Sequence, residues 1–411
     1  MFFGWRVVAG SFVSMLLIVG FFTYSFTLLV TPIRDAFDAS LEQVMYGLTL
    51  GTFGGLLVSP ITGILVDRYS VRNLMSVGCL IVAGGFWWMA QATSITQFTL
   101  VFAATMCLGN SFAGSMPGSA AVSRWFVASR GKALGIATIG TSIGGMVLPA
   151  LTTWWLETGD WRSTLENFSL VTLLLVTPFV WFNVHGRPHD KGLEPEGGTG
   201  ANNGSVAETP EGLDMKTIAR QPAFWLIAIG IGLLVAVFSS FMANLSPYAL
   251  GLGKSAVQAS SLIMALAIAG LVGKILFGMG ADRFSLKLGI ALSQGLVAIA
   301  FLIFASQPAY PVMLLAAIAM GLATGGLLPV WNAMVAHIFG VQSYGRAMGL
   351  MFPITTLLIM PAYALIGRLY DMQGNYTLCL WIYTGVLAVS ALLLAPVKMK
   401  SLSAEPQVGN R

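Results

Sequence analysis

The stretch GILVDRYS at 63–70 returns as GMGADRFS at 278–285, 215 residues later. Each copy ends an apolar run of about twenty residues, and a run of that length can cross a bilayer as a helix. A helix-and-turn unit repeated at half the length of the chain indicates a membrane protein built from two related halves.

Two further matches keep almost the same spacing. GKALG at 131–135 returns as GRAMG at 345–349, and GDW at 159–161 returns as GNY at 374–376. Each match alone is weak, but their common order and offset predict duplicated halves in parallel orientation.

The composition agrees with this interpretation. Of 411 residues, 56% are hydrophobic and 9% charged, whereas soluble domains are about a quarter charged. A soluble enzyme and a nucleic-acid-binding protein are therefore excluded. Apolar runs predict spans near 8–31, 43–65, 74–93, 97–122, 132–155, 164–184, 222–248, 256–279, 287–306, 310–337, 346–368 and 376–396. We expect an all-α integral membrane protein with twelve transmembrane helices in two six-helix pseudo-repeats.

The same pattern sets the expected domains. Residues 1–184 form one six-helix bundle and 222–400 the other, followed by a tail at 401–411. The segment 185–221 contains seven Gly, three Pro and ten charged residues, which is typical of a flexible aqueous linker.

The cations indicate the orientation. Sixteen of the 21 Lys and Arg fall on the side that carries both termini and the linker, and four fall on the other side. This bias predicts a multi-pass protein of the plasma (inner) membrane with both termini in the cytoplasm.

No residue set predicts catalysis. The three His lie at or beyond helix ends, and no GxxxxGK[ST] motif is present to bind a nucleotide phosphate. The three Cys lie inside apolar runs, where a free thiol behaves as a small hydrophobe. We therefore expect no enzyme activity, no metal site, no disulfide and no cofactor.

The repeated Asp-Arg turns are the first candidate functional residues. They lie where a predicted helix reaches the cytoplasmic face, so their side chains can pair with neighbouring helix ends. We predict structural and gating roles for Asp67, Arg68, Asp282 and Arg283.

Lys274 is the most informative residue. It lies eight positions before Asp282, about 12 Å inside the helix end. A charge at that depth costs a few kcal/mol and usually faces a cavity or a partner. We favour a cavity-facing anion site; a Lys that snorkels to the interface and a structural ion pair are the alternatives.

Polar and aromatic residues inside other predicted spans are secondary candidates for substrate contact, although most such groups only bond between helices. Those chosen to shape the pocket are Tyr24, Asn110, Trp331 and Asn332. Gly135, Gly140, Gly144, Gly145 and Pro149 are instead expected to serve helix packing and bending.

With these residues in place, the chain resembles the major facilitator superfamily over nearly its full length. GILVDRYSVR is similar to that superfamily's signature between helices 2 and 3, with Ser70 and Val71 where a Gly and a basic residue are usual. Other stretches resemble its monocarboxylate porter branch, which includes the oxalate/formate antiporters: GWRVVAGSF at 4–12, RWFVASRGKALGIA at 124–137, RPHDKGLEP at 187–195, PAFW at 222–225 and GRLYDMQGNY at 367–376.

The resemblance implies a role for Lys274. In that branch a basic residue on helix 8, four before a Gly and eight before the loop Asp, binds the substrate carboxylate, and Lys274 has this spacing, although Arg is usual there. Tyr24 and Ser25 match a substrate-lining pair of the oxalate-transporting relatives. The second cation of those relatives, on helix 11, is missing from 355–363, which favours a monocarboxylate.

We therefore expect a secondary transporter of small organic anions that works by alternating access, as a proton symporter or an anion exchanger. Its expected partners are the lipid bilayer and a small carboxylate, alone or with a proton, with no nucleic acid and with the monomer able to act alone. The alternatives are an exporter of lipophilic drugs and a transport-dead membrane sensor.

Overall fold

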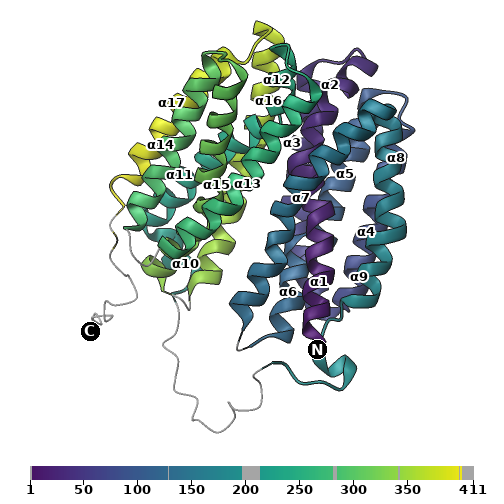
Figure 1. Cartoon of the computed structure of the whole chain (residues 1–411). Helices are drawn as coiled ribbons and strands as arrows, with labels where there is room; N and C mark the ends of the chain where they lie inside the picture. Colours follow the sequence, from purple (N-terminus) through teal and green to yellow (C-terminus); the bar gives the residue numbers. More distant parts are fainter. Residues whose placement is uncertain are drawn as a thin grey trace. The chain divides into compact units, whose positions relative to one another are not determined.

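The computed structural model describes residues 2–127, 129–196, 213–280, 285–340, 343–397 and 399. Within them, twelve helical stretches are long and apolar enough to cross a membrane (Figure 1). This confirms the expected all-helical fold with twelve spans, which are numbered 1 to 12 along the chain.

Spans 1 to 6 belong to the first half. Span 1 consists of α1 (Gly4–Ser14), π-helical turns at Met15–Val19 and Phe21–Ser25, and α2 (Phe26–Ala36). Spans 2, 3 and 5 are α3 (Leu41–Arg68), α4 (Val71–Ala90) and α7 (Arg130–Thr158). Span 4 consists of α5 (Ile95–Ala113) and α6 (Ser115–Trp125). Span 6 consists of α8 (Trp161–Val171), a π-helical turn at Thr172–Val176, and α9 (Thr177–Asn183).

The second half follows the same plan. Span 7 is α11 (Pro222–Met242), continued after a break by α12 (Leu245–Gly251). Spans 8 to 12 are α13 (Ala256–Gly280), α14 (Leu286–Ala305), α15 (Tyr310–Phe339), α16 (Tyr344–Gln373) and α17 (Thr377–Leu394). The segment assigned to the linker contains a 3₁₀ turn at Pro188–Lys191 and the short helix α10 (Met215–Arg220).

Helix boundaries reproduce the repeat seen in the sequence. Helix α4 begins at Val71 and α14 begins at Leu286, 215 residues later, and both contain 20 residues. Helices α3 and α13, which begin at Leu41 and Ala256, have the same offset. The two halves are therefore pseudo-repeats in structure as well as in sequence.

Local sequence explains where several helices begin. Ser40 and Gln43 form a capping box at the start of α3, in which each side chain bonds the other residue's backbone N–H. Asp160 and Ser163 do the same for α8. Such boxes satisfy N–H groups that the first helical turn leaves unpaired.

The chain divides into two compact units, each of which is described by itself. The first unit contains spans 1 to 6 together with Phe241–Ile268 and Tyr363–Asn375 from the second half. The second unit contains the described residues of 213–240, Ala269–Ala362 and those from Tyr376 onward.

Span 1 lies in the core of the first unit. The Phe21 ring lies 4.4 Å from the Phe86 ring of α4 and 4.8 Å from the Phe168 ring of α8, measured between centroids. On its other side, Leu16 and Gly20 contact α7: a Cβ on Gly144 would lie 2.3 Å from the Leu16 carbonyl oxygen. Only glycine permits this approach, so Gly144 has the packing role expected from the sequence.

Candidate functional site

Tyr24 lies in the π-helical turn Phe21–Ser25 of span 1. π-helical turns interrupt the regular ladder of backbone hydrogen bonds and are frequent at functional sites. Its ring is half-buried against α7: a Cβ on Gly145 would lie 2.9 Å from Tyr24 Cδ2 and 2.7 Å from the Cβ of Ala267. Span 1, α7 and the middle of α13 thus meet at one point, with the tyrosine ring beside it.

A polar pair lies within one helical turn of Tyr24 along span 1. The backbone N–H of Ser246, in α12, donates to Oγ1 of Thr27 at 3.1 Å. Ser246 belongs to the part of span 7 that follows the break at residues 243–244. The hydroxyls of Ser25 and Ser246 are fully buried and have no hydrogen-bond partner among the described residues.

Asn110 lies where span 4 breaks. Helix α5 ends at Ala113, and the backbone N–H of Gly114 donates to the Asn110 carbonyl at 3.0 Å. A Cβ on Gly114 would lie 2.5 Å from Asn110 Oδ1, so the amide side chain folds over its own helix end. The structure therefore places Asn110 at a break in the helix, whereas the sequence had predicted one uninterrupted span at 97–122.

Trp331 and Asn332 are consecutive residues of α15 in the second unit. The Trp331 ring is 3% exposed and lies 5.5 Å from the Phe352 ring of α16, between centroids. Trp331 Nε1 and Asn332 Oδ1 are both buried without a hydrogen-bond partner among the residues the structure describes, and so is the hydroxyl of Thr355 on α16. Unpaired buried polar atoms are rare and often mark a place where a ligand or water bonds.

Lys274 lies on α13, where it is half-buried. Its neighbour Gly273 is packed against α15, since a Cβ there would lie 2.3 Å from the Leu322 carbonyl oxygen. Asn332 follows Leu322 by ten residues, about 15 Å along α15. Lys274 and Asn332 thus lie on two helices that pack together, but at different heights along them. Tyr24 and Asn110 lie in the other unit.

The predicted gating residues are only partly described. Arg68 is the last residue of α3 and is exposed, and Asp67 precedes it in the same helix. Asp282 and Arg283 lie outside the described residues. Near the end of α3, Arg124 Nη2 donates to the carbonyl oxygen of Val66 at 3.0 Å, a contact between α6 and α3 that the sequence did not predict.

Among the expected packing residues, Gly135 differs from the others. A Cβ on Gly140 would lie 2.4 Å from the Phe12 carbonyl oxygen, whereas a Cβ on Gly135 would meet nothing within 4 Å. The structure therefore gives no packing reason for glycine at 135.

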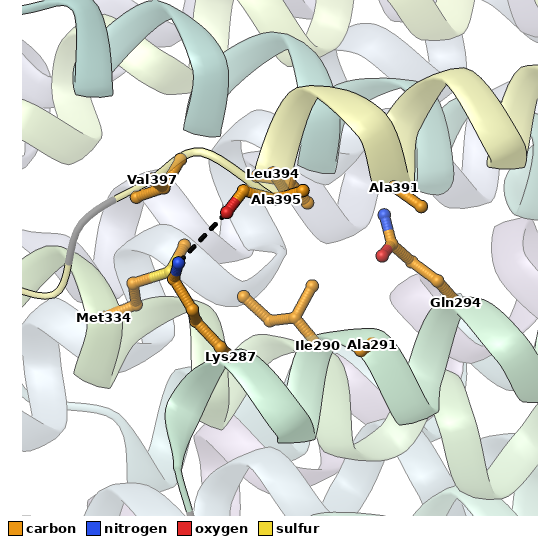
Figure 2. A pocket seen from close by; sticks show the side chains of 9 residues that line it. All are labelled: Lys287, Ile290, Ala291, Gln294, Met334, Ala391, Leu394, Ala395 and Val397. Carbon is orange, nitrogen blue, oxygen red and sulfur yellow. Dashed lines mark hydrogen bonds between the residues drawn. The ribbon is translucent and has the colours of Figure 1, made fainter.

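A cavity in the second unit is lined by none of these candidates. It has a volume of about 170 Å³ and is bounded by α14, α15 and α17. Figure 2 shows Lys287 beside it, with Nζ donating to the Ala395 carbonyl at 3.1 Å. Gln294 also lines it and donates to Ser390 Oγ at 2.7 Å. Because these polar groups bond to the protein itself, the cavity is not our candidate site.

Sequence reasoning missed three features of the site. The π-helical turns, the unpaired hydroxyls of Ser246 and Thr355, and the break of span 4 all lie in segments that hydropathy reads as uninterrupted spans. A signal for the break was present, because Asn110 and Gly114 are poor helix formers within one turn. In the described part of the chain, no three His, Cys, Asp or Glu side chains are grouped to hold a metal ion.

Similarity to known proteins indicates the family of this chain. The model of the Major Facilitator Superfamily matches residues 10–287 and 251–409. An agnestins efflux protein of Paecilomyces divaricatus is 26% identical over 404 residues, covering 96% of this chain and 88% of that protein. Monocarboxylate transporter 12 of Mus musculus is 24% identical over 426 residues, covering 98% and 87%.

Solved structures agree on the fold. A D-xylose-proton symporter superposes with a TM-score of 0.73 at 16% identity, over 97% of this chain and 99% of that one. A nucleoside transporter superposes with a TM-score of 0.74 at 14% identity, over 96% and 99%. Because the family model covers both halves and the twelve-helix fold is shared, this chain belongs to the Major Facilitator Superfamily of membrane transporters.

Proposed function

We propose that this protein is a secondary transporter of small organic anions, monocarboxylates in particular, and that Lys274 neutralises the substrate carboxylate. The observation that carries the proposal is a charge in the middle of a long apolar stretch of the sequence. No other charged residue occurs between Lys254 and Asp282, although the membrane makes any charge there costly.

The position of Lys274 on α13 supports the same proposal. It follows Ala267 by seven residues, two helical turns, and therefore shares its face of the helix. Ala267 is the residue that meets Gly145 beside the Tyr24 ring. Lys274 thus shares the face of α13 on which Ala267 contacts Gly145, and this supports a role for it inside the protein rather than toward lipid.

The remaining pocket residues would orient the substrate. Trp331 Nε1 can donate a hydrogen bond to a carboxylate oxygen, and Asn332 Oδ1 can accept one from a substrate hydroxyl or a carboxylic acid. Tyr24 and Asn110 would supply an aromatic wall and an amide. Among the relatives, the proteins named monocarboxylate transporters 12 and 13 favour a carboxylate over a sugar or a nucleoside.

Transport would proceed by alternating access, as proton symport or anion exchange. Asp67, Arg68, Asp282 and Arg283 would close the cytoplasmic side, which carries both termini and most of the cations. In this proposal the linker 185–221 joins bundles at 1–184 and 222–400, the membrane is the plasma (inner) membrane, and the monomer is sufficient.

The test is uptake of labelled carboxylates into proteoliposomes, with and without an inward proton gradient. We expect Lys274→Gln to abolish carboxylate uptake, because the anion would enter an uncompensated apolar site. Lys274→Arg keeps the charge and should retain measurable uptake. Lys216→Gln, which removes an exposed lysine from α10, is the matched control and should transport normally.

The proton gradient separates the two coupling modes. Uptake that accelerates with the gradient indicates symport, and uptake that depends only on an internal anion indicates exchange. If Lys274→Gln transports carboxylates as well as the wild type, the anion site is elsewhere and this proposal is wrong.

Export of lipophilic compounds is the second candidate. It is favoured by the relatives named as efflux proteins for agnestins and fujikurins, at 26% and 25% identity. This candidate predicts substrate-stimulated efflux of apolar dyes that Lys274→Gln leaves intact, so the same variant distinguishes the two functions.

A further inference from the structure

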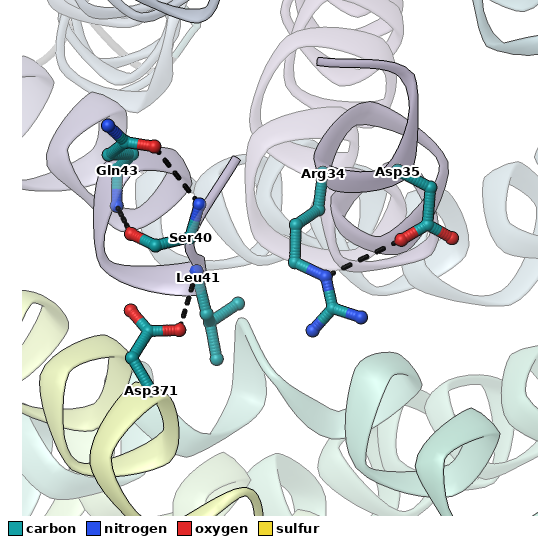
Figure 3. Close-up of polar contacts among 6 residues, drawn as sticks. All are labelled: Arg34, Asp35, Ser40, Leu41, Gln43 and Asp371. Atoms are coloured by element: carbon teal, nitrogen blue, oxygen red, sulfur yellow. Dashed lines mark hydrogen bonds and ion pairs between the residues drawn. The ribbon is translucent and has the colours of Figure 1, made fainter. Parts of the chain in front are cut away.

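The end of span 11 holds the beginning of span 2. Asp371 Oδ1 accepts a hydrogen bond from the backbone N–H of Leu41 at 2.9 Å, and its Oδ2 accepts one from the N–H of Glu42 at 2.8 Å. Figure 3 shows the carboxylate below the first turn of α3, on the far side from Gln43. Both segments belong to the first unit, so this contact joins the two halves of the sequence within one compact body.

The carboxylate completes the capping of α3. The first N–H groups of a helix have no partner within it. Ser40 Oγ accepts from the third, at Gln43, and Asp371 takes the first two. A negative charge is also favourable at this end of a helix. Because the Ser40 and Gln43 box is local, α3 keeps a defined start whether or not Asp371 is bound.

The surrounding packing is shaped for a close approach. A Cβ on Gly367, one turn before Asp371, would lie 2.6 Å from the Cα of Glu42, so only glycine fits there. Beside it, the Arg34 guanidinium lies 5.7 Å from the centroid of the Tyr370 ring. The contact is therefore a fitted surface between α16 and the α2–α3 turn.

This surface belongs to a larger set of packed residues. We name as the outer layer the residues Phe241–Ile268 and Tyr363–Asn375, which pack with the first six spans in one unit. Ser246 of this layer contacts Thr27 of span 1, and the buried hydroxyls of Ser246 and of nearby Ser25 have no partner among the described residues. Unpaired hydroxyls penalise the closed arrangement and would bond water on opening. Because its closed arrangement carries this energetic cost, the layer is suited to open and close reversibly.

We propose that Asp371 is a latch that holds the outer layer closed by gripping the N-terminus of α3. The proposal rests on the alternating-access transport proposed above, in which this layer must open once in each cycle. Release of the carboxylate frees two N–H groups to water and leaves the helix intact, so the latch can open without unfolding its receptor.

The test measures whether the layer is open without using any substrate. Ser246, which is fully buried, is replaced by Cys in a background where Cys79, Cys107 and Cys379 are Ala. A membrane-impermeant maleimide is added to reconstituted vesicles, and the labelling rate is followed. We expect Asp371→Ala to raise this rate about five-fold, the size of effect that loss of a helix cap produces. Asp371→Asn keeps one acceptor oxygen and should give a smaller rise.

Two further variants make the result specific. Gly367→Val places a side chain where the Glu42 backbone lies and should raise labelling without touching the carboxylate. Asp35→Asn removes a carboxylate that pairs with Arg34 on the same helix, and it should leave labelling unchanged. All variants are first shown to be monodisperse, and Asp371→Asn serves if Asp371→Ala is not.

Unchanged labelling in both Asp371 variants, or an equal rise in Asp35→Asn, overturns the latch. If labelling rises as expected but no carboxylate is transported by the wild type, the latch stands and the anion-transport proposal fails. If carboxylate is transported but labelling does not respond to Asp371, the reverse holds.

Discussion

Ser14 Oγ lies 2.5 Å from the carbonyl oxygen of Ala113, to which it donates a hydrogen bond. Ala113 is the last residue of α5, where span 4 breaks and its carbonyls lose their regular helical partners. A few residues earlier, Ser11 Oγ donates to the Gly118 carbonyl at 3.2 Å. Span 1 thus supplies the hydrogen bonds that the broken helix lacks.

Ser14→Ala should therefore destabilise the protein. The change leaves a buried carbonyl without its donor and costs about 1 kcal/mol. We expect a lower melting temperature in detergent, measured by tryptophan fluorescence. Ser123→Ala is the matched control, because the Ser123 hydroxyl bonds only back to Ser119 within its own helix. An equal loss in both variants would mean that the break does not depend on Ser14.

Gly144→Ala tests the packing of span 1 on α7. A methyl group at 144 would lie 2.3 Å from the Leu16 carbonyl oxygen, and overpacking of this kind costs roughly 1–3 kcal/mol. Gly135→Ala, on the same helix with nothing within 4 Å, should be neutral or slightly stabilising because alanine favours the helix. Thermal unfolding of the pair decides the matter, and a destabilised Gly135→Ala would contradict the contact map of α7.

The pH dependence of stability should reflect the cap of α8. The hydrogen bond from the Ser163 backbone N–H lowers the pKa of Asp160 below its ordinary value. A carboxylate whose pKa is depressed by folding contributes stability that is fully present above the unfolded pKa, about 3.9, and is lost as pH falls through the folded value. Asp160→Asn should therefore melt slightly earlier than the wild type at pH 7, and the two should converge as the pH falls below the folded pKa of Asp160. Melting curves across this range test the expectation, and a gap that widens at low pH would contradict it.

How far the sequence predicts this protein can be judged residue by residue. The twelve spans and the 215-residue repeat follow from hydropathy and self-similarity, because a bilayer demands long apolar helices whatever their neighbours are. The break at Asn110 was indicated only weakly, by two poor helix formers within one turn, and the unpaired hydroxyl of Ser246 was not indicated at all. Such breaks and π-helical turns also depend on donors from other helices, such as Ser14, which the local sequence does not record.

The site follows the same division. Lys274 stands out because a single charge in an apolar run is visible in one dimension. Asp371 does not, since an acidic residue near a helix end is ordinary until its two N–H partners, some 330 positions away, are known. Contacts between helices that are far apart in the sequence, such as this one, leave no mark in the hydropathy pattern.

Ser25→Ala separates stability from transport. The Ser25 hydroxyl is fully buried and has no hydrogen-bond partner among the described residues, so it penalises the closed outer layer. Its removal should raise the melting temperature, corresponding to about 1 kcal/mol, because an apolar methyl needs no partner.

If opening of the layer limits transport, the same variant should transport more slowly, since a more stable closed state is populated longer. Melting curves and initial uptake rates on one preparation measure both effects. Thr49→Ala is the control, a hydroxyl in α3 that already bonds to the Met45 carbonyl. A Ser25→Ala protein that is both less stable and slower would instead show that the hydroxyl is bonded in the membrane and that the closed layer carries no such penalty.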